Sequence, residues 1–175
     1  MKIKVCGITR EEDIAELLLA GVDFIGFNFI KSSPRYIDIN WAVNIINKYN
    51  IQKKAVPLCE IRDLKTVHHK LKNLDLPFYQ IYKVHDSSNQ IEKFNLNYFL
   101  PTSATKLKQN IDNNLFIGNK DKYLLDNFDH GLGGSGIKFN WNDLANIKLD
   151  NCMIAGGIEV KAVSYTHLRA HETVV

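Results

Sequence analysis

Two residues with acid–base side chains stand at the ends of short apolar runs. Cys6 ends a strand predicted within residues 2–8 (KIKVCGI), and Asp126 ends a strand predicted at residues 122–126 (KYLLD). If both strands belong to one parallel sheet, their ends meet at the edge where the active sites of barrel enzymes lie. A thiol and a carboxyl group there could move protons on and off a bound small molecule.

The residues around Cys6 favour a reactive thiol. A helix is predicted to begin just after it, with Thr9 and Glu12 as a capping box, and helix N-terminal amides favour a thiolate. Lys4 lies two residues back on the same strand face, about 6.5 Å away, and its ammonium group acts in the same direction. A buried core cysteine is the alternative. Cys59 and Cys152 lie within apolar runs and are assigned to the core.

Two further features could bind anionic groups at the same edge. Arg35 follows Pro34 in the loop KSSPRY, and its planar guanidinium suits a carboxylate or a phosphate, although an exposed arginine can equally be solvated. Gly156 and Gly157 end the last predicted strand, where backbone amides could hold a phosphate. Together with Cys6 and Asp126, these groups suggest metal-free proton transfer on a phosphorylated sugar.

A glycine-rich loop at residues 131–136 (GLGGSG) has the spacing G-x-G-x-x-G of a dinucleotide-binding turn. Such a turn should follow a strand at once, open a helix and precede a strand that ends in an acidic residue. None of these conditions is met here. We therefore expect no nucleotide cofactor, and interpret the loop either as a surface loop or as part of the site that begins at Asp126.

The elements that would position these residues alternate regularly. Strands are predicted within residues 2–8, 24–30, 54–60, 78–83, 97–103, 122–126 and 151–157, and helices lie between most of them. This alternation is typical of a parallel sheet with helices outside. Seven strands without a breaking linker favour an incomplete (β/α)8 barrel of the TIM type, with the eighth strand missing.

Composition limits the classes of function. The chain has 175 residues, 45% of them hydrophobic, and a formal net charge of +3. It shows no signal peptide and no apolar run long enough for a membrane span. Its three scattered cysteines suit a reducing cytoplasm. Basic residues within positions 65–72 share a window with leucines at helical spacing, which favours a solvated helix face over a nucleic-acid site.

The last residues break the pattern. His167 and His171 are spaced i, i+4, but no third ligand accompanies them, so no metal site is predicted. Residues 164–175 are interpreted as a foreign tail, and residues 1–163 as the barrel domain.

Four motifs in the same order resemble the phosphoribosylanthranilate isomerase family of tryptophan biosynthesis. They are KVCGITREEDI, IGFNFIKSSPRYI, LLDNFDHGLGGSGIKFNW and MIAGGIEVKAV, and they extend over roughly residues 2–163. The resemblance implies a TIM barrel that performs an Amadori rearrangement without a cofactor. It also implies a small phosphorylated substrate, N-(5-phosphoribosyl)anthranilate.

The resemblance also implies a role for each matching residue. Asp126 would be the general acid that opens the ribose ring, and Cys6 the general base that removes the C2 proton. Arg35 would hold the anthranilate carboxylate. Two glycine segments would surround the phosphate, and they comprise Gly133, Gly134, Ser135, Gly136, Gly156 and Gly157.

The chain departs from the family pattern at several positions. In the fourth strand, where the family has V-Q-L-H-G, Gln80 is kept while Tyr82 replaces the histidine and Lys83 the glycine. Ser135 and Asn140 replace a threonine and an aspartate.

The absent eighth strand suggests a truncated product, so an inactive fragment remains an alternative. A different sugar-phosphate isomerase, such as that of the histidine pathway, would have an aspartate in place of Cys6. Monomer and homodimer are not distinguished.

Overall fold

The computed structural model describes residues 2–82, 91, 93–103, 105–107, 109, 122–126 and 152–155. Several predicted features lie outside these residues: the tail 164–175 with its two histidines, the domain boundary at residue 163, and the proposed phosphate-binding residues Gly133, Gly134, Ser135, Gly136, Gly156 and Gly157.

The described residues form seven strands, at the positions predicted from the sequence. They are β1 (Lys4–Cys6), β2 (Phe24–Asn28), β3 (Ala55–Glu60), β4 (Tyr79–Tyr82), β5 (Tyr98–Thr102), β6 (Lys122–Leu125) and β7 (Cys152–Ile154). Their order in the sheet is the order of the chain. A dinucleotide-binding sheet would instead reverse its strand order at a switch point. The α/β barrel prediction is confirmed, and the sheet is not doubly wound.

The chain divides into two compact units. One is Ile3–Tyr98, which contains β1 to β4, and the other contains β6, β7 and β5 from Phe99 onward. In the first unit β1, β2, β3 and β4 pair in parallel with their chain neighbours. In the second, β6 pairs in parallel with both β5 and β7.

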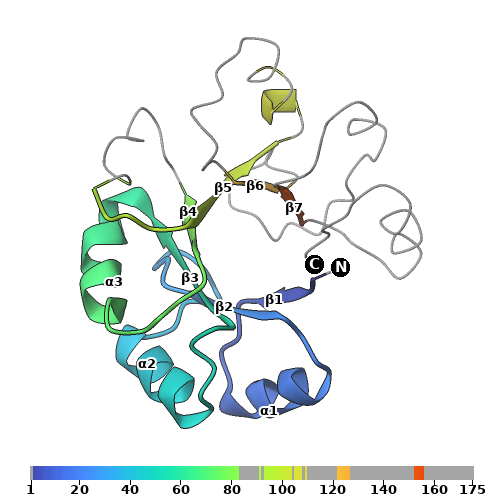
Figure 1. Ribbon diagram of the computed structural model, residues 1–175, viewed down its shortest axis with the longest axis vertical. Helices are drawn as coiled ribbons and strands as arrows, with labels where there is room; N and C mark the ends of the chain where they lie inside the picture. The colour runs from blue at the N-terminus through green and yellow to red at the C-terminus, as the bar shows by residue number, and fades with distance from the viewer. Residues whose placement is uncertain are drawn as a thin grey trace. The chain divides into compact units, whose positions relative to one another are not determined.

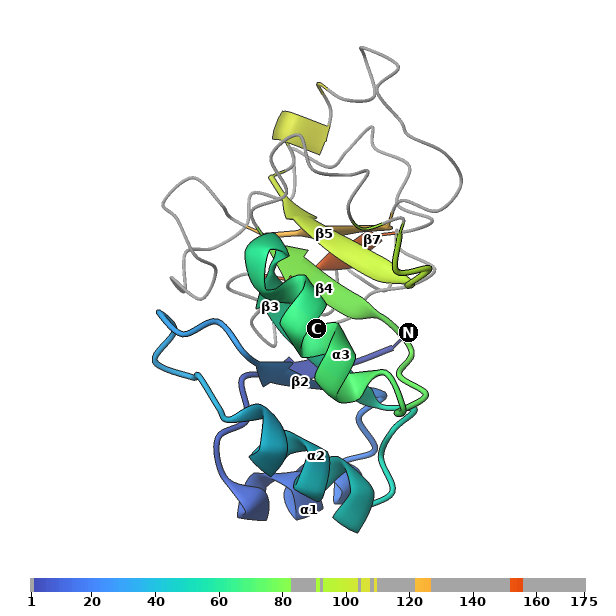
Figure 2. The ribbon, with the colours of Figure 1, turned by 90° about the vertical axis from the view of Figure 1, so that its left-hand side faces the viewer.

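Three helices cover one face of the first unit's strands (Figures 1 and 2). They are α1 (Glu11–Leu19), α2 (Ile39–Lys48) and α3 (Leu64–Leu71), and a short 3-10 turn (Ile61–Asp63) leads into α3. Each helix buries apolar residues on one side: Ile14 in α1, then Ala42, Ile45 and Ile46 in α2, and Leu64, Val67 and Leu71 in α3. Burial of these residues against the strands supplies most of the helices' stability.

The predicted capping box at Thr9 and Glu12 is wrong. The N-cap of α1 is Arg10, which is extended (φ −125°, ψ 147°) and makes no side-chain cap hydrogen bond. Its guanidinium instead forms an ion pair with Asp13, one turn into the helix. By contrast, α2 has a conventional cap, because Asp38 Oδ1 accepts hydrogen bonds from the backbone N–H groups of residues 40 and 41, at 2.8 and 3.2 Å.

The register of β1 to β4 assigns each side chain to one of two faces, because paired residues in parallel strands point to the same side. Tyr79 identifies the helix-facing side, since its ring lies 6.1 Å, centroid to centroid, from that of His68 in α3. Ile25, Phe27 and Cys59 share this side by alternation.

The opposite side is called the inner face. It carries Lys4, Cys6, Phe24, Gly26, Asn28, Val56, Leu58, Glu60, Gln80 and Tyr82. The rings of Phe24 and Phe78 meet edge to face across β3, with centroids 5.0 Å apart. Strands two places apart in a flat sheet are separated by about 9.6 Å. The contact therefore indicates that the sheet curves toward the inner face, as barrel strands do.

Candidate active site

Cys6 lies on the inner face at the C-terminal end of β1, opposite Gly26 of β2 in the register. A Cβ atom at Gly26 would lie 2.7 Å from Cys6 Sγ and 3.1 Å from its Cα, so the thiol rests directly over the glycine backbone. Cys6 is partly exposed and forms no disulfide. Any side chain at position 26 would displace the thiol. The need for glycine here was not predicted from the sequence.

Arg35 approaches Cys6 from the loop after β2. Its Cδ would lie 2.5 Å from a Cβ atom at Gly7, and its Nη1 donates a long hydrogen bond of 3.5 Å to the Cys6 carbonyl oxygen. Gly7 has φ +79°, a left-handed conformation that other residues rarely adopt. The glycine thus both turns the chain at the end of β1 and leaves room for the guanidinium. The structure brings Cys6 and Arg35 together, as the sequence predicted.

Asn28 organises the loop that carries Arg35. Its Oδ1 accepts from the Ile30 N–H at 2.9 Å, and its Nδ2 donates to Ser33 Oγ at 3.0 Å. Ser33 Oγ also accepts from the Arg35 N–H at 3.2 Å. Asn28 is 6% exposed, and a polar residue within the apolar run FIGFNFI was a visible signal that the sequence analysis did not use. A hydrogen-bonded chain therefore links a buried strand residue to the backbone of Arg35.

The C-terminal ends of β3 and β4 add further polar groups to the inner face. Glu60 is buried, and its Oε2 lies 2.7 Å from Nε of the exposed Arg62. Its register partner is Tyr82, whose hydroxyl oxygen accepts a hydrogen bond from Gln80 Nε2 at 2.5 Å. None of these residues was assigned a role from the sequence, although Tyr82 was noted as a departure from the family.

Asp126 follows β6 in the second unit. It is 7% exposed, and its N–H donates to the carbonyl of Thr102 in β5 at 3.1 Å. On the other side, the N–H of Ala155 donates to the Leu125 carbonyl at 2.7 Å. Backbone hydrogen bonds from both neighbouring strands therefore fix the position at which the carboxyl group leaves the sheet. The predicted position of Asp126, at the C-terminal end of a strand, is confirmed.

Cys59 and Cys152 are core residues, as predicted. Cys59 is fully buried on the helix-facing side, and Cys152 is 7% exposed. Burial raises the pKa of the Cys59 thiol to about 12, and the nearby carboxylates of Asp63 and Glu60 add to the effect. The Cys59 thiol therefore stays protonated at neutral pH and cannot act as a base.

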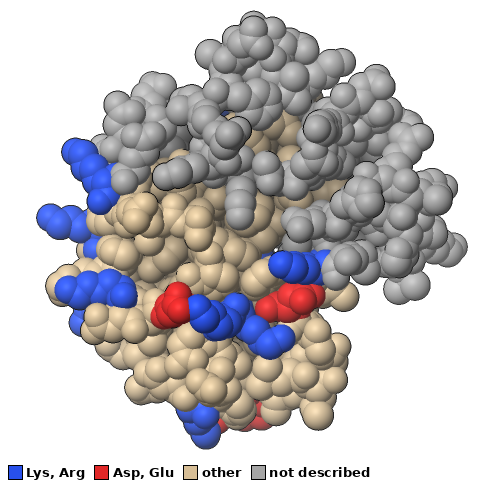
Figure 3. Space-filling view, viewed as in Figure 1, with Lys and Arg blue, Asp and Glu red and all other residues tan. Residues whose placement is uncertain are grey.

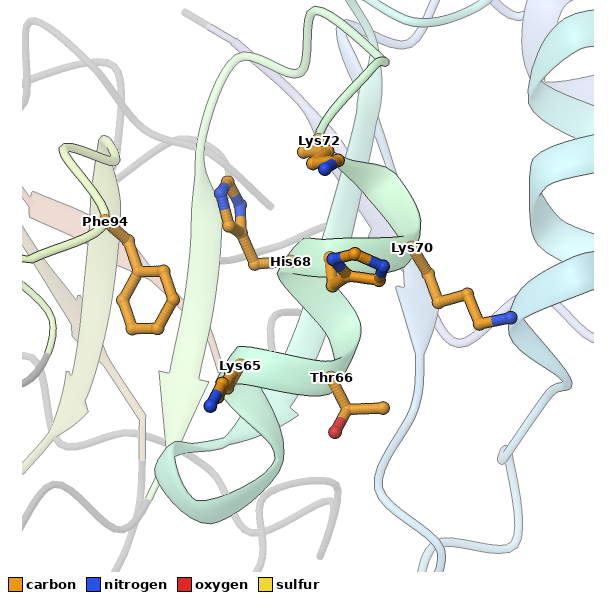
Figure 4. Close-up of a pocket in the computed structure, with 7 residues that line it drawn as sticks. Lys65, Thr66, His68, Lys70, Lys72 and Phe94 are labelled. Atoms are coloured by element: carbon orange, nitrogen blue, oxygen red, sulfur yellow. The ribbon is translucent and has the colours of Figure 1, made fainter.

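A basic hollow of about 570 Å³ lies over α3 rather than on the inner face (Figure 4). It is lined by Lys65, Thr66, His68, His69, Lys70, Lys72 and Phe94, and basic side chains gather along this edge in Figure 3. His68 packs against Phe94 with ring centroids 5.3 Å apart, and burial, with a smaller effect of Lys72 and His69, lowers its pKa. Leu64, Val67 and Leu71 are buried beneath, which confirms the amphipathic helix.

Within the described ranges, no group of three or more histidine, cysteine or acidic residues is arranged to hold a metal ion. The same ranges contain no helix that is both long and apolar enough to cross a membrane.

Parallel strands in chain order and polar residues at their C-terminal ends define an α/β barrel of the TIM type. The chain belongs to the N-(5′-phosphoribosyl)anthranilate (PRA) isomerase family, whose family model matches residues 3–171.

Individual relatives agree with this family. The chain is 37% identical over 164 residues to the tryptophan biosynthesis protein TrpCF of Buchnera aphidicola subsp. Baizongia pistaciae, covering 90% of the chain and 33% of that protein. It is 30% identical over 168 residues to the N-(5′-phosphoribosyl)anthranilate isomerase of Clostridium acetobutylicum, covering 93% and 80%. The chain thus spans about a third of the length of the TrpCF relatives it matches.

Solved structures show the same fold. The phosphoribosyl anthranilate isomerase of Thermotoga maritima aligns with a TM-score of 0.78 at 20% identity, over 99% of this chain and 86% of the other. The enzyme of Thermus thermophilus aligns with a TM-score of 0.71 at 19% identity, over 100% and 86%.

Proposed function

We propose that the chain has PRA isomerase activity. It would convert N-(5-phosphoribosyl)anthranilate to 1-(2-carboxyphenylamino)-1-deoxyribulose 5-phosphate in tryptophan biosynthesis, with no cofactor. The observation that most supports this proposal is the position of Cys6. In a chain of this family, the thiol rests over Gly26 on the inner face, with the Arg35 side chain beside it. That arrangement places a candidate base next to a candidate anion-binding group.

The reaction begins with acid catalysis. Asp126, in its protonated form, donates a proton to the ring oxygen of the ribose while the C1–O bond breaks and the anthranilate nitrogen supplies electrons to C1. The product of this step is an open-chain Schiff base. The Asp126 carboxyl group leaves the sheet at the C-terminal end of β6, the end of the strands at which barrel enzymes bind their substrates.

Base catalysis follows at C2. The Cys6 thiolate removes the C2 proton, and the electrons move through the C1–C2 bond to neutralise the iminium nitrogen. The resulting enolamine then tautomerises to the ketone. Arg35 would bind the anthranilate carboxylate and so hold C2 within reach of the thiolate. We further propose that the glycine segments 133–136 and 156–157 surround the phosphate.

The ligand is thus a small phosphorylated molecule. We expect the protein to act in the cytoplasm, since all three of its cysteines are free. The presence of Cys6, rather than an aspartate, at the end of β1 favours this isomerase over that of the histidine pathway.

Turnover of N-(5-phosphoribosyl)anthranilate by the purified chain tests the proposal directly, with the loss of anthranilate-type fluorescence as the readout. We expect turnover in the wild type and a loss of at least about a thousandfold in Cys6→Ala and in Asp126→Asn, with circular dichroism unchanged. A wild-type chain that is folded but inactive would support the fragment alternative. Near-normal turnover in either variant would remove its assigned role.

A further inference from the structure

Gln80 and Tyr82 extend the inner face beyond Cys6. The register places Cys6 level with Gly26 and Val56, whereas Gln80 is level with Asn28 and Leu58, one step nearer the C-terminal ends. Tyr82 lies a further step along. Both side chains therefore lie on the same face as the proposed base, nearer the C-terminal ends of the strands, where barrel enzymes bind their substrates.

Only one end of the Gln80 amide has a hydrogen-bond partner. Its Nε2 donates to the Tyr82 hydroxyl at 2.5 Å, but its Oε1 is buried and has no hydrogen-bond partner among the residues that the structure describes. The residue is 2% exposed. Exchanging the amide oxygen and nitrogen would leave the amino group unpaired instead. An unmade hydrogen bond in a buried group is unfavourable, and native proteins keep few of them.

The other buried amide of this face, Asn28, differs from Gln80 in this respect. Asn28 uses both ends of its amide within the loop that carries Arg35. An apolar residue of the same length at position 80 would remove the unpaired acceptor at the cost of the one hydrogen bond to Tyr82, so packing alone gives little reason for an amide there. Local rules of this kind are broken mostly at functional sites.

We propose that Gln80 binds substrate through Oε1, which accepts a hydrogen bond from a hydroxyl or N–H group of the ligand's sugar–amine portion, and that Tyr82 positions the amide. The inference rests on the proposed function. The ligand's carboxylate and phosphate offer only acceptor oxygens and cannot pair with Oε1. The hydroxyl groups of the opened sugar and the anilino N–H are donors, and the sugar C2 is the atom that must lie near Cys6.

The test uses reduced 1-(o-carboxyphenylamino)-1-deoxyribulose 5-phosphate, the ligand present in a solved structure of a related isomerase. Its binding to the 175-residue chain can be followed by fluorescence titration of its aromatic group, alongside thermal unfolding. Gln80→Met keeps the length of the side chain and removes its polar atoms. We expect binding about tenfold weaker, with the melting temperature within about 2 °C of the wild type, because the orphaned acceptor is gone as well.

Two further variants complete the experiment. Tyr82→Phe removes the hydroxyl that orients the amide and should weaken binding about threefold. Ile81→Val, on the helix-facing side between them, should lower the melting temperature and leave binding unchanged.

Unchanged binding in Gln80→Met would overturn the inference, as would a fall of more than about 5 °C in its melting temperature that accompanies weaker binding, since this marks a structural role. If the folded wild type binds no ligand, the proposed function itself fails, and the inference with it.

Discussion

The two faces of strands β1 to β4 differ chemically. The helix-facing side carries Ile25, Phe27 and Cys59, and it packs against the apolar stripes of the helices. The inner face carries Cys6, Asn28, Glu60, Gln80 and Tyr82 toward the C-terminal ends of the same strands. All of these inner-face residues except Cys6 are buried, so exposure to solvent does not explain where the polar groups lie. Under the proposed function, these polar groups lie on the side that would meet the ligand.

The two cysteines of this unit lie on opposite faces and differ in their surroundings. Cys59 is fully buried among helix contacts, and its pKa is raised to about 12. Cys6 is partly exposed, rests on a glycine and has a guanidinium nearby. The same side-chain chemistry thus serves as packing on one face and as a candidate base on the other.

Among the tests of this contrast between the faces, adding a methyl group at Gly26 should have the largest effect. In Gly26→Ala the new Cβ would lie 2.7 Å from Cys6 Sγ, so the thiol must move, and we expect kcat/KM to fall about a hundredfold. Ile25→Val, the adjacent residue on the helix-facing side, is the control. It should lower stability by about 1 kcal/mol and leave kcat/KM unchanged. Equal kinetic effects of the two variants would remove the distinction between the faces.

The hydrogen-bonded loop offers a sharper test of positioning. Ser33→Ala removes the hydroxyl that accepts from both Asn28 and the Arg35 N–H, so the guanidinium should be held less firmly. We expect KM to rise about fivefold with little change in kcat, because the role proposed for Arg35 is to bind substrate rather than to move protons. Ser32→Ala, at the exposed neighbouring position, should behave as the wild type. A fall in kcat alone in Ser33→Ala would contradict this role.

The smallest effect concerns the pH dependence of stability. The pKa of the Cys59 thiol is higher in the folded than in the unfolded state. Its contribution to the free energy of unfolding is therefore fully present below about pH 9 and is lost as the pH rises toward 12. Between pH 8 and 10, the unfolding free energy of the wild type should therefore fall by about 1 kcal/mol more than that of Cys59→Ala. Denaturant titrations at the two pH values measure the difference. If the free energy of unfolding fell equally in both proteins, burial would not control the pKa of the Cys59 thiol.

Much of the fold was predictable because strand and helix alternate with clear periodicity. The strands that end at Cys6 and Asp126 follow from short apolar runs, and the helix-facing stripe of α3 follows from Leu64, Val67 and Leu71. The first cap was wrong because Thr9 and Glu12 have the right spacing but lie one residue too early for the helix, which is preceded by Arg10.

The remaining parts of the site depend on register, which a single sequence does not reveal. Gly26 and Cys6 are 20 residues apart in the sequence. Only their pairing in the sheet shows that position 26 must be glycine to leave room for the Cys6 thiol. Asn28 and Gln80 are visible as polar residues within apolar strands. Nothing in the order of residues shows that both lie on the same face as Cys6, or that only one amide is fully paired.

The central claim is that Cys6, and not Cys59, is the working thiol. Alkylation of the native chain with iodoacetamide tests it, if modification of each cysteine is followed by mass spectrometry and turnover is measured in the same samples. We predict that activity falls in step with modification of Cys6, while Cys59 stays unmodified until the protein is unfolded. Full turnover in a chain completely alkylated at Cys6, or inactivation that follows Cys59, would contradict the claim.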